Sequence, residues 1–571
     1  MAISPGVYTK IIDLSYYLQE VPITTGFIPF FTRRGPDNKL MHSTGQDYFQ
    51  KLYGEPNIND YGKKYGLGPY IAFNHLKYSG SCYTLRLLPD DATYANLFLD
   101  LNTDGTGSVE VRSIPASTGI TSLENDAEKA QYMNQIGSNI YPFIMFYPIG
   151  RGDSYNDFGI TIKPHSNPVL ASEGVYTLNV YETSKELPKD NLKESFDVSF
   201  DPLALDEEGE SRFIEEVINR YSDILRCYVD EEHLNLFLQS DVSVNVENPL
   251  GVIEYPPGSG IQIESPAIHF SGGSEGSLVT VDPVTGRRLI DSNVAISLLV
   301  QAYQGMNQYD DVIDLDNVYF SLVYDAGYPP EVKEAIRALA EDLRRDCVAI
   351  VDLGDNPNLD KDIQARNSYP ILDTFFAAYF TPFSKIYDVH SGKNIWVSPV
   401  YHMSDMIPKN DKIYSLHKPN AGYNRGMIAG IKELRYNAKT IGQRDQLYLN
   451  QINPIVKFNI GYTVWGNLTS QKRPSKLSNL STVRTVLYIK RALEQFCKWY
   501  IFEWNNDDTY NAVATEIVGF LQTLQDAKAL DGYSVEVGAT EYEKKQKIMH
   551  VNVVLIPVGI IERINLNLFI K

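Results

Sequence analysis

The sequence predicts a multidomain protein that combines an α/β layer domain with an α+β domain. Its 571 residues exceed what one hydrophobic core usually holds, since domains typically contain about 100–200 residues. A strand–helix–strand pattern that begins at Asn317 indicates the α/β layer. Two long helices with apolar stripes, followed by two strands, indicate an α+β domain in the C-terminal third.

Residues 21–95 are predicted to form short strands and a helix. The stretch from Tyr70 to Leu76 carries its apolar residues in a helix-like order. The helix is expected to end at the turn of Ser79 and Gly80, after which Cys82–Leu87 resumes as a strand.

Residues 96–284 have a different character. Gly, Ser, Asn and Asp separate short runs of Val, Ile, Thr and Tyr, which is typical of β-structure. An acidic helix is expected within Asp206–Leu225. We therefore interpret this region as a β-rich insertion with a solvated acidic face.

The α/β unit begins with a strand in Asn317–Ala326 and continues with a helix in Pro329–Asp346. Its apolar positions Val332, Ile336, Leu339 and Leu343 form one stripe, so this face should pack on a sheet. The next segment, Cys347–Leu353, is a continuous apolar run that is typical of a buried parallel strand.

The C-terminal third contains the two long helices, which are predicted within Ser481–Trp504 and Asp507–Leu530. Strands are predicted within Tyr533–Ala539 and Ile548–Pro557. Val483, Leu487, Leu493, Phe496 and Tyr500 are placed near one face of the first helix.

The charge of the chain is distributed unevenly. The net charge is −20, yet residues 411–500 hold 15 Lys/Arg and 4 Asp/Glu, a local net of +11. This asymmetry favours one face that contacts an acidic partner, although a basic domain without a dedicated partner remains an alternative. The candidate residues, all expected to face solvent, are Lys472, Arg473, Lys476, Lys490, Arg491 and Lys498.

No catalytic or metal-binding motif with the required context is found. The nine histidines never fall at ligand spacing, no Cys-x-x-Cys pair occurs, and no phosphate-binding loop is present, so no metal and no cofactor are expected. Residues 272–276 match Gly-x-Ser-x-Gly, but without the strand–turn–helix context we expect a flexible surface loop. Arg151–Asp153 is interpreted as a loop turn, and the carboxylates of Asp352–Asp362 as a solvated loop.

The cellular context is predicted from what the sequence lacks. The N-terminus has no charged region followed by an apolar one, and no apolar run reaches 18 residues, so neither secretion nor membrane insertion is expected. The four cysteines lie in apolar runs, which is typical of buried thiols made in a reducing cytoplasm.

The two ends of the chain raise a question about pairing. "SPGVYTKIID" near the N-terminus and "INLNLFIK" at the C-terminus alternate apolar and polar residues as strands do. Neither has a hairpin partner beside it in the sequence. An unpaired strand edge is a liability, so each end is expected to pair with something distant.

Taken in order, the motifs resemble the tail sheath proteins of contractile-tailed bacteriophages and related contractile injection machines. The resemblance begins with "SPGVY", "TTGFIPFFTRRGP" and "YFQKLYGEP", followed by "YSGSCYTLRLL". It continues with "AAYFTPF", "DQLYLNQINPIVKF" and "GYTVWGNLT", and then with "STVRTVLYIKRALEQ" and "FEWNND". It covers the first hundred residues and most of 290–571, whereas 96–284 matches only loosely.

The resemblance implies a domain plan and a fold for each part. The middle domain would be a subtilisin-like α/β domain that serves as a rigid block, because fold alone supplies no catalysis. The expected parts are an N-terminal arm of residues 1–20, a middle domain of 21–95 and 285–410, a variable outer insertion of 96–284, and a tube-facing C-terminal domain of 411–571 that ends in a strand at 562–571.

The resemblance also implies how the ends pair. In a sheath, the N-terminal arm and the C-terminal strand of neighbouring subunits would add to the small sheet of one subunit. The residues facing that sheet would be Val7, Thr9 and Ile11 in the arm, and Ile564, Leu566, Leu568 and Ile570 in the C-terminal strand. Pairing of both strands within one subunit is the alternative.

The function implied is that of a structural, non-enzymatic sheath subunit in a virion tail, made in the host bacterial cytoplasm. It would polymerise helically around a tail tube and contract by rigid-body repacking to drive the tube through the host envelope. Its partners would be further copies, the tube protein, and baseplate and tail terminator proteins. The acidic 186–247 region would lie outside, and the basic candidates would face the tube.

Three alternatives remain beside this reading. The same mechanism would serve the sheath of a phage-like secretion or toxin-injection apparatus. A degenerate subtilisin-like hydrolase is an alternative of another class. Nucleic-acid binding through residues 411–500 is disfavoured, since that segment lacks the signatures of a nucleic-acid-binding motif and the chain is acidic as a whole.

Overall fold

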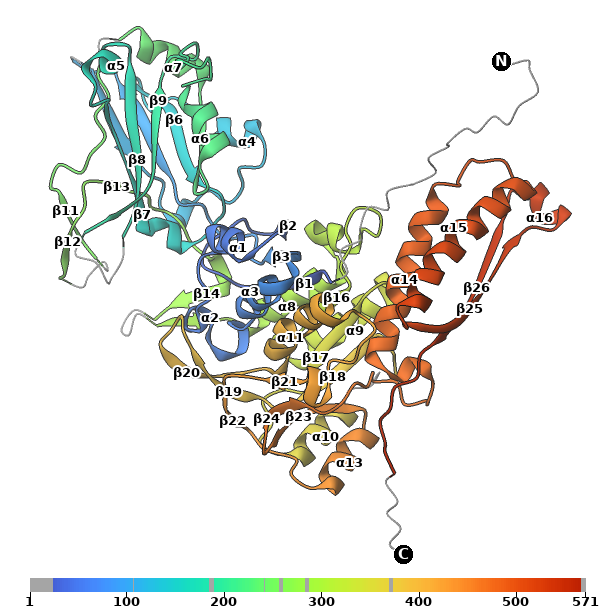
Figure 1. Cartoon of the computed structure of the whole chain (residues 1–571). Coiled ribbons are helices and arrows are strands. Elements are labelled where there is room, and N and C mark those ends of the chain that lie inside the picture. Colours follow the sequence, from blue (N-terminus) through green and yellow to red (C-terminus); the bar gives the residue numbers. More distant parts are fainter. Residues whose placement is uncertain are drawn as a thin grey trace, which may run out of the picture.

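The chain forms three parts in a computed structural model (Figure 1): a central α/β domain, a β-rich insertion on one side of it, and a narrow C-terminal module that projects on the other. This confirms a mixed α/β multidomain architecture. The structure describes residues 24–105, 107–183, 189–240, 242–255, 260–282, 287–368 and 373–565.

The central domain is built on a nine-stranded sheet whose middle strands are parallel. From β3 to β23, every neighbouring pair in the sheet runs parallel, while β2, β24 and β21 are antiparallel additions at the two edges. The strand order is β2 (Leu40–Ser43), β3 (Cys82–Arg86), β1 (Gly26–Phe30), β16 (Leu322–Tyr324), β17 (Val348–Asp352), β18 (Ala377–Thr381), β23 (Ile452–Phe458), β24 (Gly461–Val464) and β21 (Met427–Ile428).

The predicted strand–helix–strand unit is confirmed as β16, a helix and β17. The helix is α9 (Pro330–Ala338), extended by a π-helical turn at Leu339–Arg344. Every residue of β1, β17 and β18 is buried, as expected for parallel strands covered on both faces.

Two pairs of helices cover the sheet. α8 (Ser292–Gln304) packs on α9, and α3 (Gly68–Ser79) packs on α11 (Pro399–Tyr414). α3 ends where the sequence predicts, because Gly80 adopts a left-handed conformation that terminates the helix before β3 begins.

The central sheet does not stop at residue 410, where the C-terminal domain is expected to begin. β21, β23 and β24 lie beyond that residue, and β23 pairs in parallel with β18. These strands belong to the central domain because their ladder hydrogen bonds and the buried side chains of Ile452 and Ile455 complete its sheet and core.

The insertion is a sandwich of two antiparallel four-stranded sheets that share one core. One sheet contains β10 (Leu225–Val229), β6 (Ile140–Pro148), β4 (Leu97–Asn102) and β5 (Ser108–Arg112). The other contains β13 (Ile268–His269), β7 (Phe158–Pro164), β8 (Val175–Glu182) and β9 (Asn191–Ser199). Ile144 and Ile160, from different sheets, lie in the same hydrophobic cluster.

The acidic helix of the insertion is shorter than predicted. It spans only α6 (Ile214–Tyr221), while Asp206–Glu210 forms a turn closed by the Asp206 carboxylate. A second helix, α7 (Glu231–Leu238), follows β10. The Asp206 side chain accepts hydrogen bonds from the amides of Glu208 and Glu210, which favours a turn over a helical start.

The C-terminal module consists of α14 (Leu480–Lys498), α15 (Asp507–Asp526) and the hairpin of β25 (Leu530–Gly538) and β26 (His550–Pro557). Its own small core includes Val513, Ile517 and Leu521. α14 has two apolar faces rather than one, because Val483 and Leu487 join the central core while Ile489 and Leu493 pack in the module.

The remaining elements are short, and three of them, β20, β19 and β22, form a separate small sheet. No helix among the described residues has the length and apolar character needed to span a bilayer. The short elements are α1 (Gln46–Tyr53), α2 (Ile58–Tyr65), α4 (Asp126–Ala130), α5 (Pro168–Ser172), α10 (Leu359–Ser368), α12 (Gly422–Arg425), α13 (Ile441–Leu449), α16 (Glu541–Lys545), β11 (Val252–Glu254), β12 (Gln262–Glu264), β14 (Val279–Val281), β15 (Arg288–Ile290), β19 (Ser384–Asp388), β20 (Lys393–Val397) and β22 (Ile431–Leu434).

Candidate assembly surfaces and the joint between the domains

The predicted arms lie mostly outside the described residues. This applies to Val7, Thr9 and Ile11 at the N-terminal end, and to Leu566, Leu568 and Ile570 at the C-terminal end. Ile564 is described: 83% of its surface is exposed, and residues 558–565 belong to no strand. The pairing of the arms with neighbouring copies stays a prediction.

The hairpin of β25 and β26 is a sheet of only two strands. Its register pairs Val535 with Val553, and the side chains on its inner face pack on α15. Within the described part of the chain neither strand has a second neighbour, so both outer edges present ladder hydrogen-bonding groups. On the outer face, Val554 and Ile556 are more than half exposed. A two-stranded sheet with open edges is suited to strand addition.

Three of the six basic candidates lie in the loop before α14 and are exposed. These are Lys472, Arg473 and Lys476. The Lys476 ammonium donates to the carbonyl of Pro557, 3.4 Å away, at the end of β26. This loop therefore presents positive charge close to the open hairpin.

The other three candidates lie on α14, and their environments differ. Lys498 is exposed, with its Nζ 2.5 Å from Oδ1 of Asp316. Lys490 is half-buried and donates to the carbonyl of Arg345.

The prediction that Arg491 faces solvent is wrong. Only 5% of its surface is exposed; its guanidinium donates to the carbonyl of Leu315 at 2.8 Å and lies over the ring of Tyr319. The residue helps hold α14 on the central domain. In the helical pattern of the sequence, Arg491 falls on the face that is predicted to be exposed. It is buried because the central domain packs against this part of α14.

A buried arginine organises the joint between the central domain and the insertion. Arg86 on β3 is fully buried and donates to four backbone carbonyls. Three of its acceptors, those of Thr32, Arg33 and Gly35, belong to the segment after β1; the fourth, that of Arg151, belongs to the insertion. One side chain thus ties two parts of the chain together.

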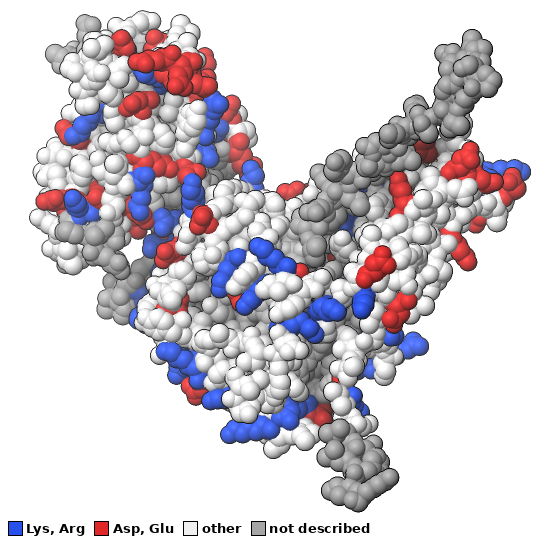
Figure 2. Space-filling model, in the orientation of Figure 1, with Lys and Arg blue, Asp and Glu red and all other residues white. Residues whose placement is uncertain are grey.

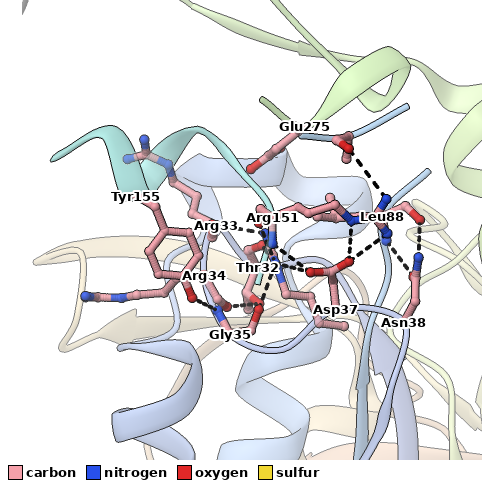
Figure 3. Close-up of polar contacts among 12 residues, drawn as sticks. Thr32, Arg33, Arg34, Gly35, Asp37, Asn38, Leu88, Arg151, Tyr155 and Glu275 are labelled. Atoms are coloured by element: carbon pink, nitrogen blue, oxygen red, sulfur yellow. Dashed lines mark hydrogen bonds and ion pairs between the residues drawn. The ribbon is translucent and has the colours of Figure 1, made fainter. Parts of the chain in front are cut away.

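Ion pairs surround this arginine and cross the same joint. Arg151 places Nε 2.7 Å from Oδ2 of Asp37, and its amide donates to the same carboxylate. Arg34 pairs with Glu182 on β8 at 3.1 Å. The turn expected at Arg151–Asp153 is therefore a buried contact of the joint rather than a free loop, because Arg151 is only 8% exposed. The amide of Gly35 donates to the Tyr155 hydroxyl (Figure 3), which adds a neutral contact.

Residues 272–276 also pack in the joint, so the expectation of a flexible surface loop is wrong. Glu275 is 3% exposed, pairs with Arg288 at 2.5 Å and accepts a hydrogen bond from the Tyr61 hydroxyl at 2.8 Å. Burial raises the pKa of Glu275 to about 7. The small residues allow this approach: a Cβ on Gly273 would lie 2.3 Å from the carbonyl oxygen of Gly152.

Buried charges also lie at the carboxyl ends of the central strands. The Lys333 ammonium lies between Asp325 and Asp352, and the Ser398 hydroxyl donates to Asp352 at 2.5 Å. Burial, and then the nearby Asp352, raise the pKa of Asp325 above its usual range. The prediction of a solvated loop at Asp352–Asp362 is therefore wrong at both ends of the segment, because Asp352 and Asp362 are buried and hydrogen-bonded.

Several serine–histidine pairs lie at hydrogen-bond distance, among them Ser265 with His269 at 3.1 Å and Ser81 with His42 at 2.9 Å; the shortest is Ser384 with His402. The Ser384 hydroxyl lies 2.6 Å from Nε2 of His402. Both residues are buried in the protein, and burial lowers the pKa of His402 to about 3. Among the described residues no group of His, Cys, Asp and Glu has the arrangement of a metal site.

Comparison with known proteins finds similarity to tail sheath proteins, and a family model matches the C-terminal part of the chain. Residues 472–571 match the family model of the phage tail sheath C-terminal domain. A tail sheath protein of Vibrio phage KVP40 is 22% identical over 471 residues, which cover 74% of this chain and 64% of the phage protein. The match thus spans slightly less than two thirds of that relative.

Two solved structures share the fold over nearly the whole chain. The sheath tail protein of Listeria innocua has a TM-score of 0.54 at 9% identity and covers 94% of this chain and 92% of its own. The sheath tail protein of Desulfitobacterium hafniense has a TM-score of 0.50 at 11% identity and covers 97% of this chain and all of its own.

These matches confirm the resemblance that the sequence motifs suggest. The module of α14, α15, β25 and β26 lies within the matched residues, as do Lys472, Arg473 and Lys476. Residues 472–571 are thus similar to the phage tail sheath C-terminal domain, and the chain shares the fold of sheath tail proteins.

Proposed function

We propose that this protein is the structural subunit of a contractile tail sheath in a virion. It polymerises helically around a tail tube and shortens by rigid-body repacking, which drives the tube through the host envelope. The single observation that carries the proposal is the open two-stranded sheet of β25 and β26, which lies within the matched sheath domain.

Strand exchange between copies completes this sheet. The N-terminal arm of residues 1–20, with Val7, Thr9 and Ile11 on one face, adds to one edge of the hairpin of a neighbour. The terminal strand at 562–571, with Ile564 at its start, adds to the other. Main-chain hydrogen bonds supply the affinity, and the alternation of apolar side chains sets the register. The exposed Val554 and Ile556 extend the apolar surface that such strands cover.

The central domain and the insertion move as one rigid block. The joint around Arg86 supports this, because its hydrogen bonds and ion pairs link the segment after β1 with Arg151 and Glu182 of the insertion. The central part of the block is the subtilisin-like α/β domain, and its role is mechanical rather than catalytic. The burial of His402 with Ser384 supports this, since a buried pair meets no substrate.

Positive charge on the C-terminal domain contacts an acidic tail tube. Lys472, Arg473, Lys476 and Lys498 remain candidates because they are exposed. Arg491 cannot contact the tube because the central domain buries it. Lys490 is a poorer candidate than the others because its side chain is half-buried. Exposed pairs contribute only about 0–1 kcal/mol each, which suits a contact that must release on contraction.

The insertion faces outward and carries the acidic surface. Residues 96–284 hold 31 Asp/Glu and 10 Lys/Arg. Acidic side chains gather at the end of the insertion that is distant from the central domain (Figure 2). Baseplate and tail terminator proteins bind the two ends of the assembled sheath. The sheath of a phage-like injection apparatus works by the same mechanism and is equally compatible with the fold.

Electron microscopy of the purified protein tests the proposal. The intact chain and a version lacking residues 1–14 are compared by negative stain at the same high concentration. We expect long hollow tubes from the intact chain and none from the truncated one. Tubes from both versions would discard the role of the N-terminal arm. Discrete monomers of the intact chain, even with a tube protein added, would contradict the proposed function.

A further inference from the structure

The turn between α14 and α15 exposes an unusual group of large apolar side chains. Phe502 is fully exposed, Trp504 is 81% and Trp499 77% exposed, and Ile501 is also more than half exposed. We call residues 499–504 the aromatic tip. Two of the four tryptophans of the chain lie here, and clustered exposed apolar residues mark interaction sites in soluble proteins.

Hydrogen bonds hold the backbone of the aromatic tip in place, which fixes the positions from which its side chains project. The amide of Glu503 donates to the carbonyl of Tyr500 at 3.2 Å, and the Asn505 side chain donates to the carbonyl of Ile548. Phe502 adopts a φ of 76°, a conformation that bulky residues rarely take. Such an outlier, held by surrounding hydrogen bonds, is typical of binding sites.

Acidic residues border the aromatic tip. Glu503 lies within it, and Asp507 and Asp508 begin α15 directly after it. All three are exposed, and Glu503 and Asp508 form no ion pair within the described part of the chain. A fitting partner therefore offers an apolar surface bordered by positive charge.

The chain itself carries a surface of that chemistry at the edge of the central sheet. Tyr423, Phe458 and Trp465 pack ring against ring beside β24 and β21, and Tyr423 and Trp465 are exposed. Ile460 and Met427 extend the apolar area. We call this group of aromatic residues, with the basic side chains around it, the basic-aromatic surface.

The positive charges of the basic-aromatic surface have no acidic partner in the part of the chain that the structure describes. Arg444 lies over the ring of Phe458, and its guanidinium donates to backbone carbonyls. Arg425 likewise donates to a carbonyl, that of Pro419. Among the described residues, neither of these nor Lys457 forms an ion pair with an acid. Figure 2 shows Lys and Arg gathered over this lower part of the molecule.

The two surfaces lie at opposite ends of the subunit. The turn between α14 and α15 is at the free end of the projecting module, whereas β21 and β24 lie at the far side of the central domain (Figure 1). They cannot meet within one copy. A contact between two different surfaces of identical chains is heterologous and produces helical polymers when the rotation does not close a ring.

We propose that the aromatic tip of one copy docks on the basic-aromatic surface of the next copy. This contact rests on the proposed function and adds to strand exchange a second, side-chain interface between subunits. Trp499, Phe502 and Trp504 cover Tyr423, Phe458 and Trp465, while the acidic border of the tip faces Arg425, Arg444 and Lys457. Aromatic residues at the centre of an interface commonly carry most of its affinity.

Cysteine cross-linking of the full chain tests the contact directly. In a Cys497→Ser background, Phe502→Cys is combined with Tyr423→Cys and oxidised; the other three cysteines are buried. We expect a ladder of dimers, trimers and longer chains. Phe502→Cys paired with Leu203→Cys, an exposed site on the insertion, is the matched control and should give no ladder. Dimers from Phe502→Cys alone in equal yield would overturn the proposal, as would absence of the ladder at high concentration.

Charge reversal supplies a second test that does not depend on reactive cysteines. Glu503→Lys and Lys457→Glu are each expected to raise the concentration at which tubes form, and the double variant should restore it. Trp504→Ala should raise that concentration about tenfold. All these residues are exposed, so the variants should fold.

The outcomes separate this inference from the proposed function. If the unaltered chain forms tubes and the variants at the tip form them equally well, the tip contact is wrong and the sheath function stands. If tip variants lose only the binding of a tube protein, the tip binds the tube and the proposal is also overturned. If the unaltered chain never forms tubes, the sheath function fails, and the cross-linked ladder still decides whether copies meet through the tip.

Discussion

The central domain and the C-terminal module differ in how far their strands and apolar side chains are paired and buried within one copy. In the central domain the parallel strands β1, β17 and β18 are wholly buried, and even its charges, such as those of Lys333 and Asp352, are paired inside. The module has a small core, an exposed aromatic tip and a sheet whose two edges have no partner strand among the described residues. The difference teaches that the strands of the central domain are paired and covered within one copy, whereas the module leaves strand edges and aromatic side chains available for a partner.

The largest effect is expected from breaking the buried charge cluster of the central domain. Lys333→Met leaves Asp325 and Asp352 buried without their cation, which should lower the free energy of unfolding by about 3–5 kcal/mol. Denaturant titration measures the loss. Lys545→Met, at an exposed site on α16, is the control and should change little. Equal stability of both variants would show that the central domain does not depend on this cluster.

A core substitution in the module should loosen the module alone. Ile517→Ala removes a fully buried side chain between α15 and the hairpin, at an expected cost of about 2–4 kcal/mol. Hydrogen exchange should then quicken in β25 and β26 and remain unchanged in β17. Val518→Ala, which truncates a 40%-exposed neighbour, is the matched control. Faster exchange in β17 as well would mean that the two parts unfold together.

The stability of the central domain should fall in acid because of its buried histidines. Burial lowers the pKa of His402 to about 3 and that of His75 to about 4, against about 6.5 in the unfolded chain. The unfolded state therefore takes up the extra protons, so this stability is fully present above pH 6.5 and is lost as the pH falls toward 3–4.

Comparison of the unaltered chain with His402→Gln isolates this contribution, because other titrating groups cancel in the difference. Between pH 7 and pH 5 the unaltered chain should lose about 2 kcal/mol more than the variant, as judged by denaturant titration. The same loss in both proteins would exclude His402 as the cause.

The smallest effect on the isolated chain is expected at the outer face of the hairpin. Val554→Ser with Ile556→Ser should change the free energy of unfolding by less than about 0.5 kcal/mol, since both side chains are exposed. Tube formation, followed by sedimentation and microscopy, should nevertheless weaken strongly. Val281→Ser with Leu289→Ser makes the same change in the hairpin of β14 and β15 and should leave assembly intact. Loss of assembly in the control pair would remove the special role of β25 and β26.

Local pattern accounts for the elements that the sequence predicts well. The turn at Gly80, the helix from Pro330 and the apolar strand Val348–Asp352 depend on neighbours within a few residues, and the structure agrees with each. The motifs that resemble sheath proteins likewise need only the order of the residues, and the family match to residues 472–571 agrees with them.

Only the tertiary structure decided which polar residues are buried. Arg491 sits where the helical pattern predicts solvent, yet the segment that contains Leu315 and Tyr319 covers it. Arg151 and Glu275 resemble loop residues, but segments more than a hundred residues apart meet around them. In each case the cost of burying the charge is offset by partners distant in the sequence, which no local pattern reveals.

The sequence by itself therefore determined the class of fold and the basic C-terminal third, and it predicts strands at the two ends. The tertiary structure decided that the sheet extends past residue 410 and that the insertion is held on the central domain through Arg86. It also decided that no other described segment covers the hairpin edges or the aromatic tip. The physical reason is range: periodicity and turn chemistry act between neighbours, whereas burial and strand pairing depend on which distant segments meet.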